Sequence, residues 1–330
     1  MSTNQVSITT ALAEAWERMK VILFRPFDLK KWFVLGFTAW LAGLASGGGS
    51  TGSSSWEAPD LGNSEELKWG SEGVPTWIDW PRWSEWLLEH PIWLAAGVLG
   101  CVFLIAVALA VLWVSSRGKF MFLDNVVHNR AEVVRPWKRY RRVANSHFGF
   151  QLAFLAALLA FAIGLGLTVF ATVRGGVDLD FDTPAPFIAL AIAVPALVLI
   201  VLIIAYLQYF LDGFVVPLMY RYDLKVMAAW SRFGGLFRRH PFALLLSGPF
   251  LLLLGLAVVV AVLLAGLLTC CIGLLLVIIP YIGTVVLLPV PVTYRGFTVA
   301  LLEQMDPGFF PTEAMPPAPQ PPAPETPAST

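Results

Sequence analysis

The ionisable side chains that could do chemistry in this sequence lie at the ends of long apolar runs. Five of them could form a polar cluster at one face of a membrane: Arg117, Asp124, Asp212, Arg221 and Arg295. An ionisable group within a bilayer usually belongs to an ion, proton or substrate pathway. Local pairing is the simpler interpretation, with Asp212 beside Arg221 or a basic loop, and Asp124 beside Arg117 or at a helix terminus.

Sequence motifs for catalysis or metal binding are absent. The four histidines lie outside the apolar runs and have no His or carboxylate partner at a metal-site spacing: His90, His128, His147 and His240. Cys101 stands alone and Cys270 adjoins Cys271, whereas a zinc site needs spaced ligands that converge on one ion. The sequence therefore predicts no catalytic, cofactor-binding or metal-binding residue, and nothing in it favours an enzyme.

The composition is that of a protein that crosses a membrane several times. Of 330 residues, 57% are hydrophobic and 13% charged, against about 25% charged in soluble domains. The net charge is zero, so no basic field favours nucleic acid as a partner. Because a helix needs roughly 20 apolar residues to cross a bilayer, we predict an all-α membrane protein with six transmembrane helices. They lie near 32–46, 92–114, 148–173, 187–211, 242–264 and 271–292.

The basic residues predict the orientation of these spans. Most of the 22 lysines and arginines fall before Trp32, within 115–147 or within 220–241. Only Lys68, Arg82 and Arg174 fall in the segments on the other side. The positive-inside rule therefore predicts an inner (plasma) membrane protein with both termini in the cytoplasm. The run 32–46 is the shortest span and ends at a run of glycines.

Residues 1–305 are predicted to form one helical membrane domain. Within it, 47–91 is an outer loop, first rich in Gly and Ser and then in Trp, which favours the membrane interface. An aromatic ligand platform is the alternative for these tryptophans. The Pro-rich tail 306–330 is predicted to be disordered, with docking to a proline-binding partner as the alternative.

A short internal repeat groups the six spans into three hairpins. Trp-x-Arg recurs at Trp16, Trp137 and Trp230, each time shortly before a span. These tryptophans are candidate interfacial anchors of amphipathic helices on the cytoplasmic leaflet, where neighbouring basic residues would meet anionic lipids. In the first copy the apolar stripe consists of Leu12, Ala15, Trp16, Met19, Ile22 and Leu23.

Three stretches resemble a bacterial family of multi-spanning membrane proteins of unknown function. They are AWERMKVILFRPFDLKKWFVLGFTAWLAGL from Ala15, SSRGKFMFLDNVV from Ser115 and PYIGTVVLLPVPVTYRGFTVALLEQMDPGF from Pro280. The helix-then-hairpin pattern is also similar to the membrane domain of some glycerophosphodiester phosphodiesterases. This second similarity implies a helical membrane domain without the phosphodiesterase activity, which resides in a separate soluble barrel.

Two functions are favoured by these features, ahead of a third, a membrane enzyme, which would require Arg117, Asp124, Asp212 and Arg295 to converge at the inner face. The first is a non-catalytic membrane scaffold, lipid-associated protein or accessory subunit, with membrane lipids, a protein partner or a second copy of the chain as its partners. The alternative is a transporter or export component for an apolar or amphiphilic solute. It would use the proline-containing fourth to sixth spans, which hold Pro195, Pro249 and Pro280, as a gate. A cavity at mid-membrane lined by those spans would favour the transporter.

Overall fold

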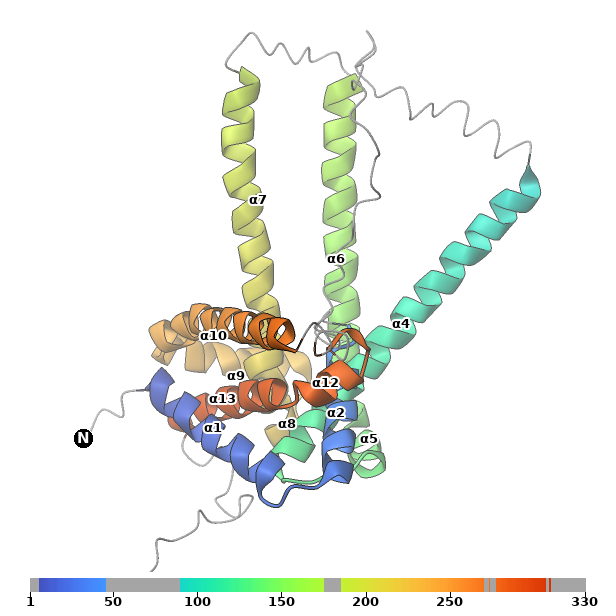
Figure 1. The fold of residues 1–330 in the computed structure, drawn as a ribbon. Helices are drawn as coiled ribbons and strands as arrows, with labels where there is room; N and C mark the ends of the chain where they lie inside the picture. The colour runs from blue at the N-terminus through green and yellow to red at the C-terminus, as the bar shows by residue number, and fades with distance from the viewer. Residues whose placement is uncertain are drawn as a thin grey trace, which may run out of the picture.

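Three long helices extend from one side of a compact helical body. The computed structural model describes residues 6–45, 90–174, 185–269, 273, 277–306 and 309, and every regular element in these residues is a helix. The long helices are α4 (Pro91–Val127), α6 (Arg141–Arg174) and α7 (Ala185–Phe210) (Figure 1). Their free ends lie far from the body, and α4 tilts away from the other two.

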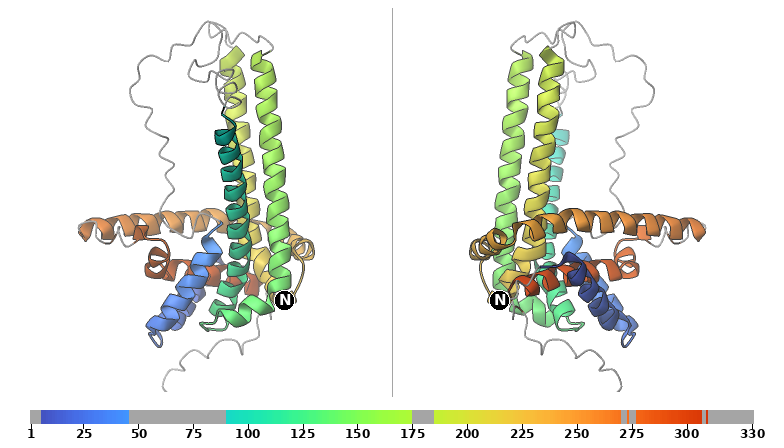
Figure 2. Two further views of the ribbon diagram at one scale, coloured as in Figure 1. Left: turned by 90° about the vertical axis from the view of Figure 1, so that its right-hand side faces the viewer. Right: turned by 90° about the vertical axis from the view of Figure 1, so that its left-hand side faces the viewer.

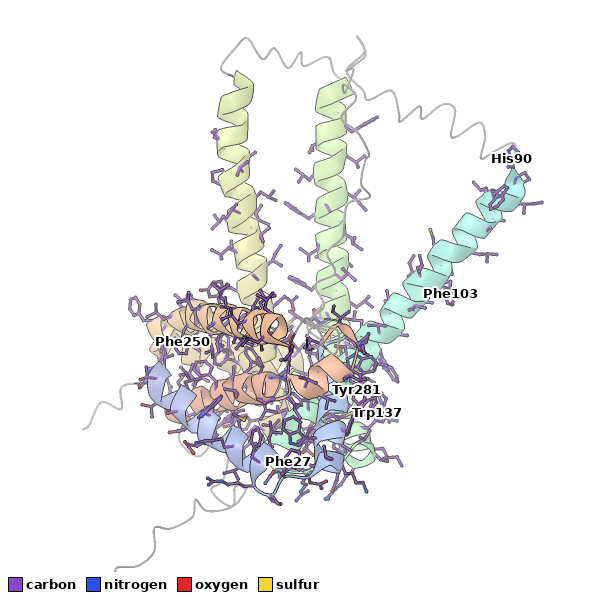
Figure 3. All side chains as sticks on the ribbon, in the orientation of Figure 1. Phe27, His90, Phe103, Trp137, Phe250 and Tyr281 are labelled. Atoms are coloured by element: carbon purple, nitrogen blue, oxygen red, sulfur yellow. The ribbon has the colours of Figure 1, made fainter. Side chains whose placement is uncertain are left out.

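Four helices in this part of the chain are long and apolar enough to cross a membrane. They are α4, the first 28 residues of α6, the run Ala191–Tyr222, which begins six residues into α7, and α10 (Pro241–Leu268). They match the predicted spans 92–114, 148–173, 187–211 and 242–264. Large apolar side chains cover them and remain exposed, for example Phe103 (66%) on α4 and Leu252 (70%) on α10 (Figure 3). Such surfaces suit lipid rather than water as their surroundings.

The fifth and sixth predicted spans do not form a pair of long parallel helices. α10 runs across the direction of α6 and α7, as two perpendicular views show (Figure 2). Of the predicted span 271–292, the described residues 277–292 form the short helix α12 (Ile282–Val286) and the start of α13 (Pro289–Met305). Pro280 and Pro289 explain the interruption, because proline lacks the amide hydrogen that a continuing helix needs.

The first predicted span differs in length and in its packing partner. Helix α2 (Leu29–Gly43) has 15 residues and is about 22 Å long, less than the roughly 30 Å bilayer core. It packs beside the last third of α4 rather than beside 92–114. The Ser115 hydroxyl donates to the Ala42 carbonyl at 2.9 Å, and a Cβ added at Gly118 would lie 2.6 Å from the Ala42 nitrogen.

The body is built from short helices around the buried ends of the long ones. It contains α1 (Ile8–Phe24), α5 (Val134–Arg139), α8 (Val216–Tyr222), α9 (Val226–Arg239), α13 and the π-helical turn η1 (Leu211–Val215). Large side chains fill its core: Phe120, Phe214, Phe297, Leu218, Met219 and Leu301. Helix α4 continues through 115–127, which the sequence assigned to a cytoplasmic loop, and all but the last of these residues are buried.

The predicted stripe of α1 lies on one face of the helix, but most of that face packs against other helices of the body rather than against the cytoplasmic leaflet. Ala15, Met19, Ile22 and Leu23 are buried, and Ala15 faces Gly296 of α13 closely enough that an added Cβ would lie 3.2 Å away. Trp16 differs, because 52% of it is exposed. The predictions for the outer loop 47–91, except for its last two residues, and for the Pro-rich tail 306–330, except for Asp306 and Phe309, fall outside the described residues.

Candidate functional site

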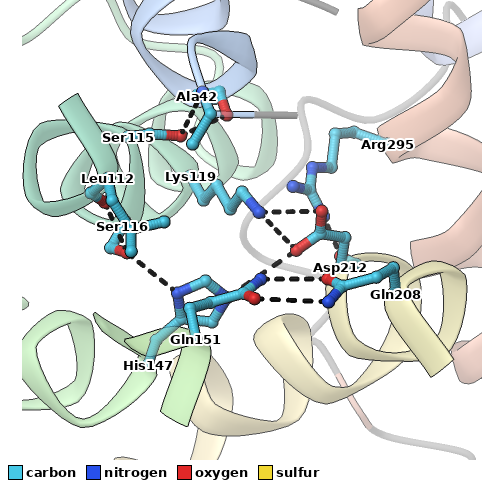
Figure 4. Close-up of polar contacts among 11 residues, drawn as sticks. Ala42, Leu112, Ser115, Ser116, Lys119, His147, Gln151, Gln208, Asp212 and Arg295 are labelled. Carbon is cyan, nitrogen blue, oxygen red and sulfur yellow. Dashed lines mark hydrogen bonds and ion pairs between the residues drawn. The ribbon is translucent and has the colours of Figure 1, made fainter. Parts of the chain in front are cut away.

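A polar cluster lies where α4, α6 and η1 meet inside the body. Its centre is an ion pair between Lys119 of α4 and Asp212 of η1, with Lys119 Nζ 2.6 Å from Asp212 Oδ1 and 2.8 Å from Oδ2 (Figure 4). The Lys119 side chain is 5% exposed and that of Asp212 is 21% exposed. Burying a charge costs free energy unless the charge is paired. Each of these side chains therefore offsets the cost of burying the other.

His147 of α6 connects this ion pair to Ser116 of α4. His147 Nδ1 lies 3.1 Å from Ser116 Oγ, and His147 Nε2 lies 3.7 Å from Asp212 Oδ1. Both His147 and Ser116 are 1% exposed. The second distance is too long for a hydrogen bond, and among the described residues Nε2 has no hydrogen-bond partner.

Serine, histidine and aspartate in this order invite comparison with a hydrolase triad. In a triad, histidine takes a proton from the serine hydroxyl while the carboxylate orients the imidazole. Here the Ser116 hydroxyl donates to the Leu112 carbonyl at 2.9 Å within its own helix, and Asp212 is bound by Lys119. A serine that is 1% exposed cannot receive a substrate carbonyl without rearrangement of the body. The arrangement therefore holds helices together and does not present a nucleophile.

One further contact and an irregular turn of the backbone complete the cluster. The Arg295 guanidinium of α13 donates to the backbone carbonyl of Asp212. The π-helical turn shifts the backbone bonding, so that the Val216 amide bonds to Leu211, and such turns often occur at functional sites. Burial lowers the pKa of Arg295, while the nearby Asp212 raises it, and arginine remains charged in either case.

Gln151 of α6 and Gln208 of α7 bond to each other through both amides. Gln151 Nε2 donates to Gln208 Oε1 at 3.0 Å, and Gln208 Nε2 donates to Gln151 Oε1 at 3.3 Å (Figure 4). Each glutamine thus has a donor and an acceptor satisfied at the point where the two helices leave the body. This pairing joins α6 to α7 without any charge.

The structure brings together two of the five residues singled out in the sequence, Asp212 and Arg295. Arg117 instead lies over the rings of Trp113 and Trp137, at 4.2 and 4.8 Å from their centroids. Its Nη2 also donates to Asn145 at 3.3 Å. The suggested pairing of Arg117 with Asp124 is therefore wrong.

Asp124 and Arg221 have other partners as well. The Asp124 carboxylate accepts hydrogen bonds from the hydroxyls of Tyr220 at 2.7 Å and Tyr140 at 3.0 Å. Arg221 donates to the Phe309 carbonyl, so the suggested Asp212–Arg221 pair is replaced by Asp212–Lys119. The other suggestion for Asp212 is a partner from a neighbouring basic loop; its partner Lys119 does come from the basic stretch 115–147, but that residue belongs to helix α4 and is 93 positions away.

The three anchor tryptophans occupy different environments. Trp16 is exposed on α1, whereas Trp137 packs edge-to-face on Trp113 with ring centroids 5.7 Å apart. Trp230 packs against Phe150 and Phe233, and its Nε1 is buried without a hydrogen-bond partner in the described part of the chain. Of the three, Trp16 alone presents most of its indole to the surroundings that an interfacial anchor requires.

An apolar groove of about 560 Å³ lies on another side of the body. Its walls are helices α1, α10 and α13, which contribute residues at helical spacing. They are Thr9, Leu12, Ala13 and Trp16 from α1; Leu251, Leu254, Gly255 and Val258 from α10; and Pro289, Val290, Thr293, Tyr294 and Phe297 from α13. Its lining is almost wholly apolar, and its volume falls in the roughly 300–1,000 Å³ range of small-ligand sites.

Sequence reasoning missed Lys119, Ser116 and His147 because it assigned 115–147 to a basic loop. The spacing did indicate that the helix continues. The apolar run resumes at Phe120–Leu123 after a short polar and small stretch, which includes Ser115, Ser116, Gly118 and Lys119. In the described residues no group of three His, Cys, Asp or Glu side chains is placed to hold a metal ion.

Comparison with known proteins places the chain in a family. It belongs to a family of unknown function, DUF7544, whose profile matches residues 6–309. No curated protein and no solved structure matches it. The class is therefore that of an uncharacterised family with apolar helices suited to a membrane, and the similarity to glycerophosphodiester phosphodiesterases has no support from these comparisons.

Proposed function

We propose that the protein is a non-catalytic, lipid-associated membrane scaffold. The observation that carries this proposal is the contrast between its interior and its surface. The charged residues of the polar cluster pair with one another inside the body, while the long helices expose apolar side chains along most of their length. Paired interior charges fix helices in place, and an exposed apolar surface requires lipid or a protein partner around it.

Exposed cations on the body support anionic lipids as its partners. Arg25, Lys30, Arg135, Lys138, Arg238 and Arg239 are exposed. Helix α9 illustrates the arrangement, because Ala229, Phe233 and Leu236 are buried while Arg238 and Arg239 face outward. A basic residue near an anionic leaflet contributes about 1 kcal/mol to binding.

We also propose six crossings in three hairpins, in an inner membrane with both termini in the cytosol. The position of α1 supports a crossing before α4. Helix α1 packs in the body beside the C-terminal end of α4, whereas His90 lies at the opposite, free end of α4 (Figure 3). The described ends of this part of the chain, α1 and His90, thus lie at opposite ends of α4, which supports a crossing between them, and the basic segments lie mainly at the body.

A flux assay separates the scaffold from the transporter alternative. The protein would be reconstituted in liposomes containing a fluorescent phospholipid, after alkaline carbonate has been shown to leave it in the membrane fraction. A scaffold gives no transbilayer movement of that lipid above that of empty liposomes. Protein-dependent movement that increases with the protein-to-lipid ratio would replace the scaffold with the transporter.

A further inference from the structure

The three walls of the apolar groove differ in a way that indicates what fills it. α10 is an uncharged helix of 28 residues whose side chains are apolar except for that of Ser247, of the kind that resides in hydrocarbon. α1 is amphipathic, with one face buried in the body, one lining the groove and a charged face that includes Glu14 and Glu17. The groove thus lies between a surface that requires lipid and a helix that borders water.

The chemistry of the lining favours an alkyl chain. Thr293 donates its hydroxyl to the Pro289 carbonyl at 2.7 Å, so it offers no free donor to a ligand. A peptide strand would bring many backbone amides and carbonyls into a groove whose lining is almost wholly apolar, with only the hydroxyls of Thr9, Thr293 and Tyr294, so most of those groups would remain unpaired. A hydrocarbon chain carries no such groups.

A charge pair on α1 follows the residues of this helix that line the groove. Lys20 lies one helical turn beyond Trp16 on the same side of α1, since residues four apart share a face. Its Nζ is 2.7 Å from Glu17 Oε1, and both side chains are partly exposed, at 38% and 68%. Apolar walls followed by charges on the same helix match an amphiphile, whose chain requires burial and whose headgroup requires water.

We propose that this groove binds one acyl chain of a membrane phospholipid, with the headgroup directed towards the Lys20 end of α1. The inference rests on the proposed membrane location and adds a defined lipid site to it. Phe250 of α10 stacks on Phe297 of α13, with ring centroids 5.9 Å apart, so the two helices make direct contact beside the cavity. The groove is therefore part of the folded body.

Gly255 provides a way to fill the groove without disturbing the body. It lines the groove, and a Cβ added there would meet no atom within 4 Å. Gly164 of α6 has the same open surroundings and does not line the groove. Gly255→Phe and Gly164→Phe are thus a test variant and a matched control on two apolar helices.

The experiment uses the full chain in lipid nanodiscs that contain a phospholipid with a photoreactive diazirine on one acyl chain. After illumination, mass spectrometry locates the labelled peptides. We expect label concentrated on the groove-lining segments of α1, α10 and α13. Gly255→Phe should reduce it roughly tenfold, equivalent to about 1.4 kcal/mol of binding, and Gly164→Phe should leave it unchanged.

Two results would overturn the inference, and they differ in what else they affect. The first result is uniform labelling along α4, α6, α7 and α10 that Gly255→Phe does not change. It would show ordinary lipid contact and leave the scaffold proposal intact. Protein released from membranes by alkaline carbonate would overturn both the membrane scaffold and the acyl-chain site.

Discussion

Lys119 and Asp212 are 93 positions apart in the chain and form an ion pair with Lys119 Nζ 2.6 Å from Asp212 Oδ1. The pair joins α4 to the π-helical turn η1, and His147 and Arg295 contact the same aspartate. Asp212 of η1 therefore contacts three other segments of the chain, α4 and α6 through its carboxylate and α13 through its backbone carbonyl.

Asp212→Asn should destabilise the body. The amide cannot balance the charge of Lys119, whose side chain is 5% exposed, and removing one partner of a buried pair costs about 3–5 kcal/mol. The free energy of unfolding in detergent measures the effect. The control is Asp223→Asn, which weakens the Arg142–Asp223 pair, where both side chains are about two-thirds exposed. Such exposed pairs contribute about 0–1 kcal/mol.

Asparagine is a well-matched replacement at position 223 because Asp223 has a φ of 48°. Asparagine tolerates this left-handed conformation better than most residues, so the control removes a charge without new backbone strain. Equal losses in Asp212→Asn and Asp223→Asn would contradict a structural role for the buried pair.

Gly118→Ala should separate α2 from α4. The added methyl carbon would lie 2.6 Å from backbone atoms of Leu41 and Ala42, and backbone cannot move aside as a flexible side chain can. Overpacking of this kind costs about 1–3 kcal/mol. Gly100→Ala on the same helix meets nothing within 4 Å, so its thermal unfolding should match the wild type or improve slightly. A stable Gly118→Ala protein would refute the close α2–α4 contact.

Ser116 should not react with a fluorophosphonate probe, which labels activated serines. Its hydroxyl is bonded to the Leu112 carbonyl and is buried beneath His147. Gel fluorescence of the purified protein, with a serine hydrolase as positive control, measures the labelling. Labelling that disappears in Ser116→Ala would establish an accessible nucleophile and reopen the case for an enzyme.

Cysteine labelling should place Ser54 and Lys138 on opposite sides of the membrane, because α4 lies between them in the chain. Lys138 is exposed and suits this purpose, whereas Ser116 is buried. The single-cysteine variants Ser2→Cys, Ser54→Cys and Lys138→Cys would be made after replacing Cys101, Cys270 and Cys271 by serine. An impermeant maleimide then reports the side.

The three labelled positions decide the first two crossings. With six spans, Ser2→Cys and Lys138→Cys should share the protected side in intact cells, and Ser54→Cys should react. Reaction at both Ser2→Cys and Ser54→Cys would mean that no crossing precedes α4, and it would overturn the six-span topology.

Hydropathy predicted where the long helices lie, because apolar composition is a local property of the sequence. It did not predict how far α4 extends. Arg117 and Lys119 were assigned to a loop since charges are excluded from lipid, yet the structure buries both residues. Trp113, Trp137 and Asp212 make that burial tolerable, and two of these three lie far away in the sequence.

The candidate cluster shows the same limit. Position at the end of an apolar run singled out Asp212 and Arg295, and the structure shows that these two residues contact each other. The choice of Lys119 rather than Arg221 as the partner of Asp212 depends on how α4 and η1 approach, which no local pattern encodes. The π-helical turn was likewise absent from the prediction, because its sequence LDGFV is compatible with an ordinary helix.

The mutual amide bonds of Gln151 and Gln208 constrain how α6 and α7 can turn. Rotation of either helix about its long axis would move one carboxamide away from the other. Both hydrogen bonds would then break, and the polar groups would lack partners in apolar surroundings. The pair therefore prevents rotation at the base of both helices. It thereby determines which faces of their outer halves a neighbouring molecule can contact.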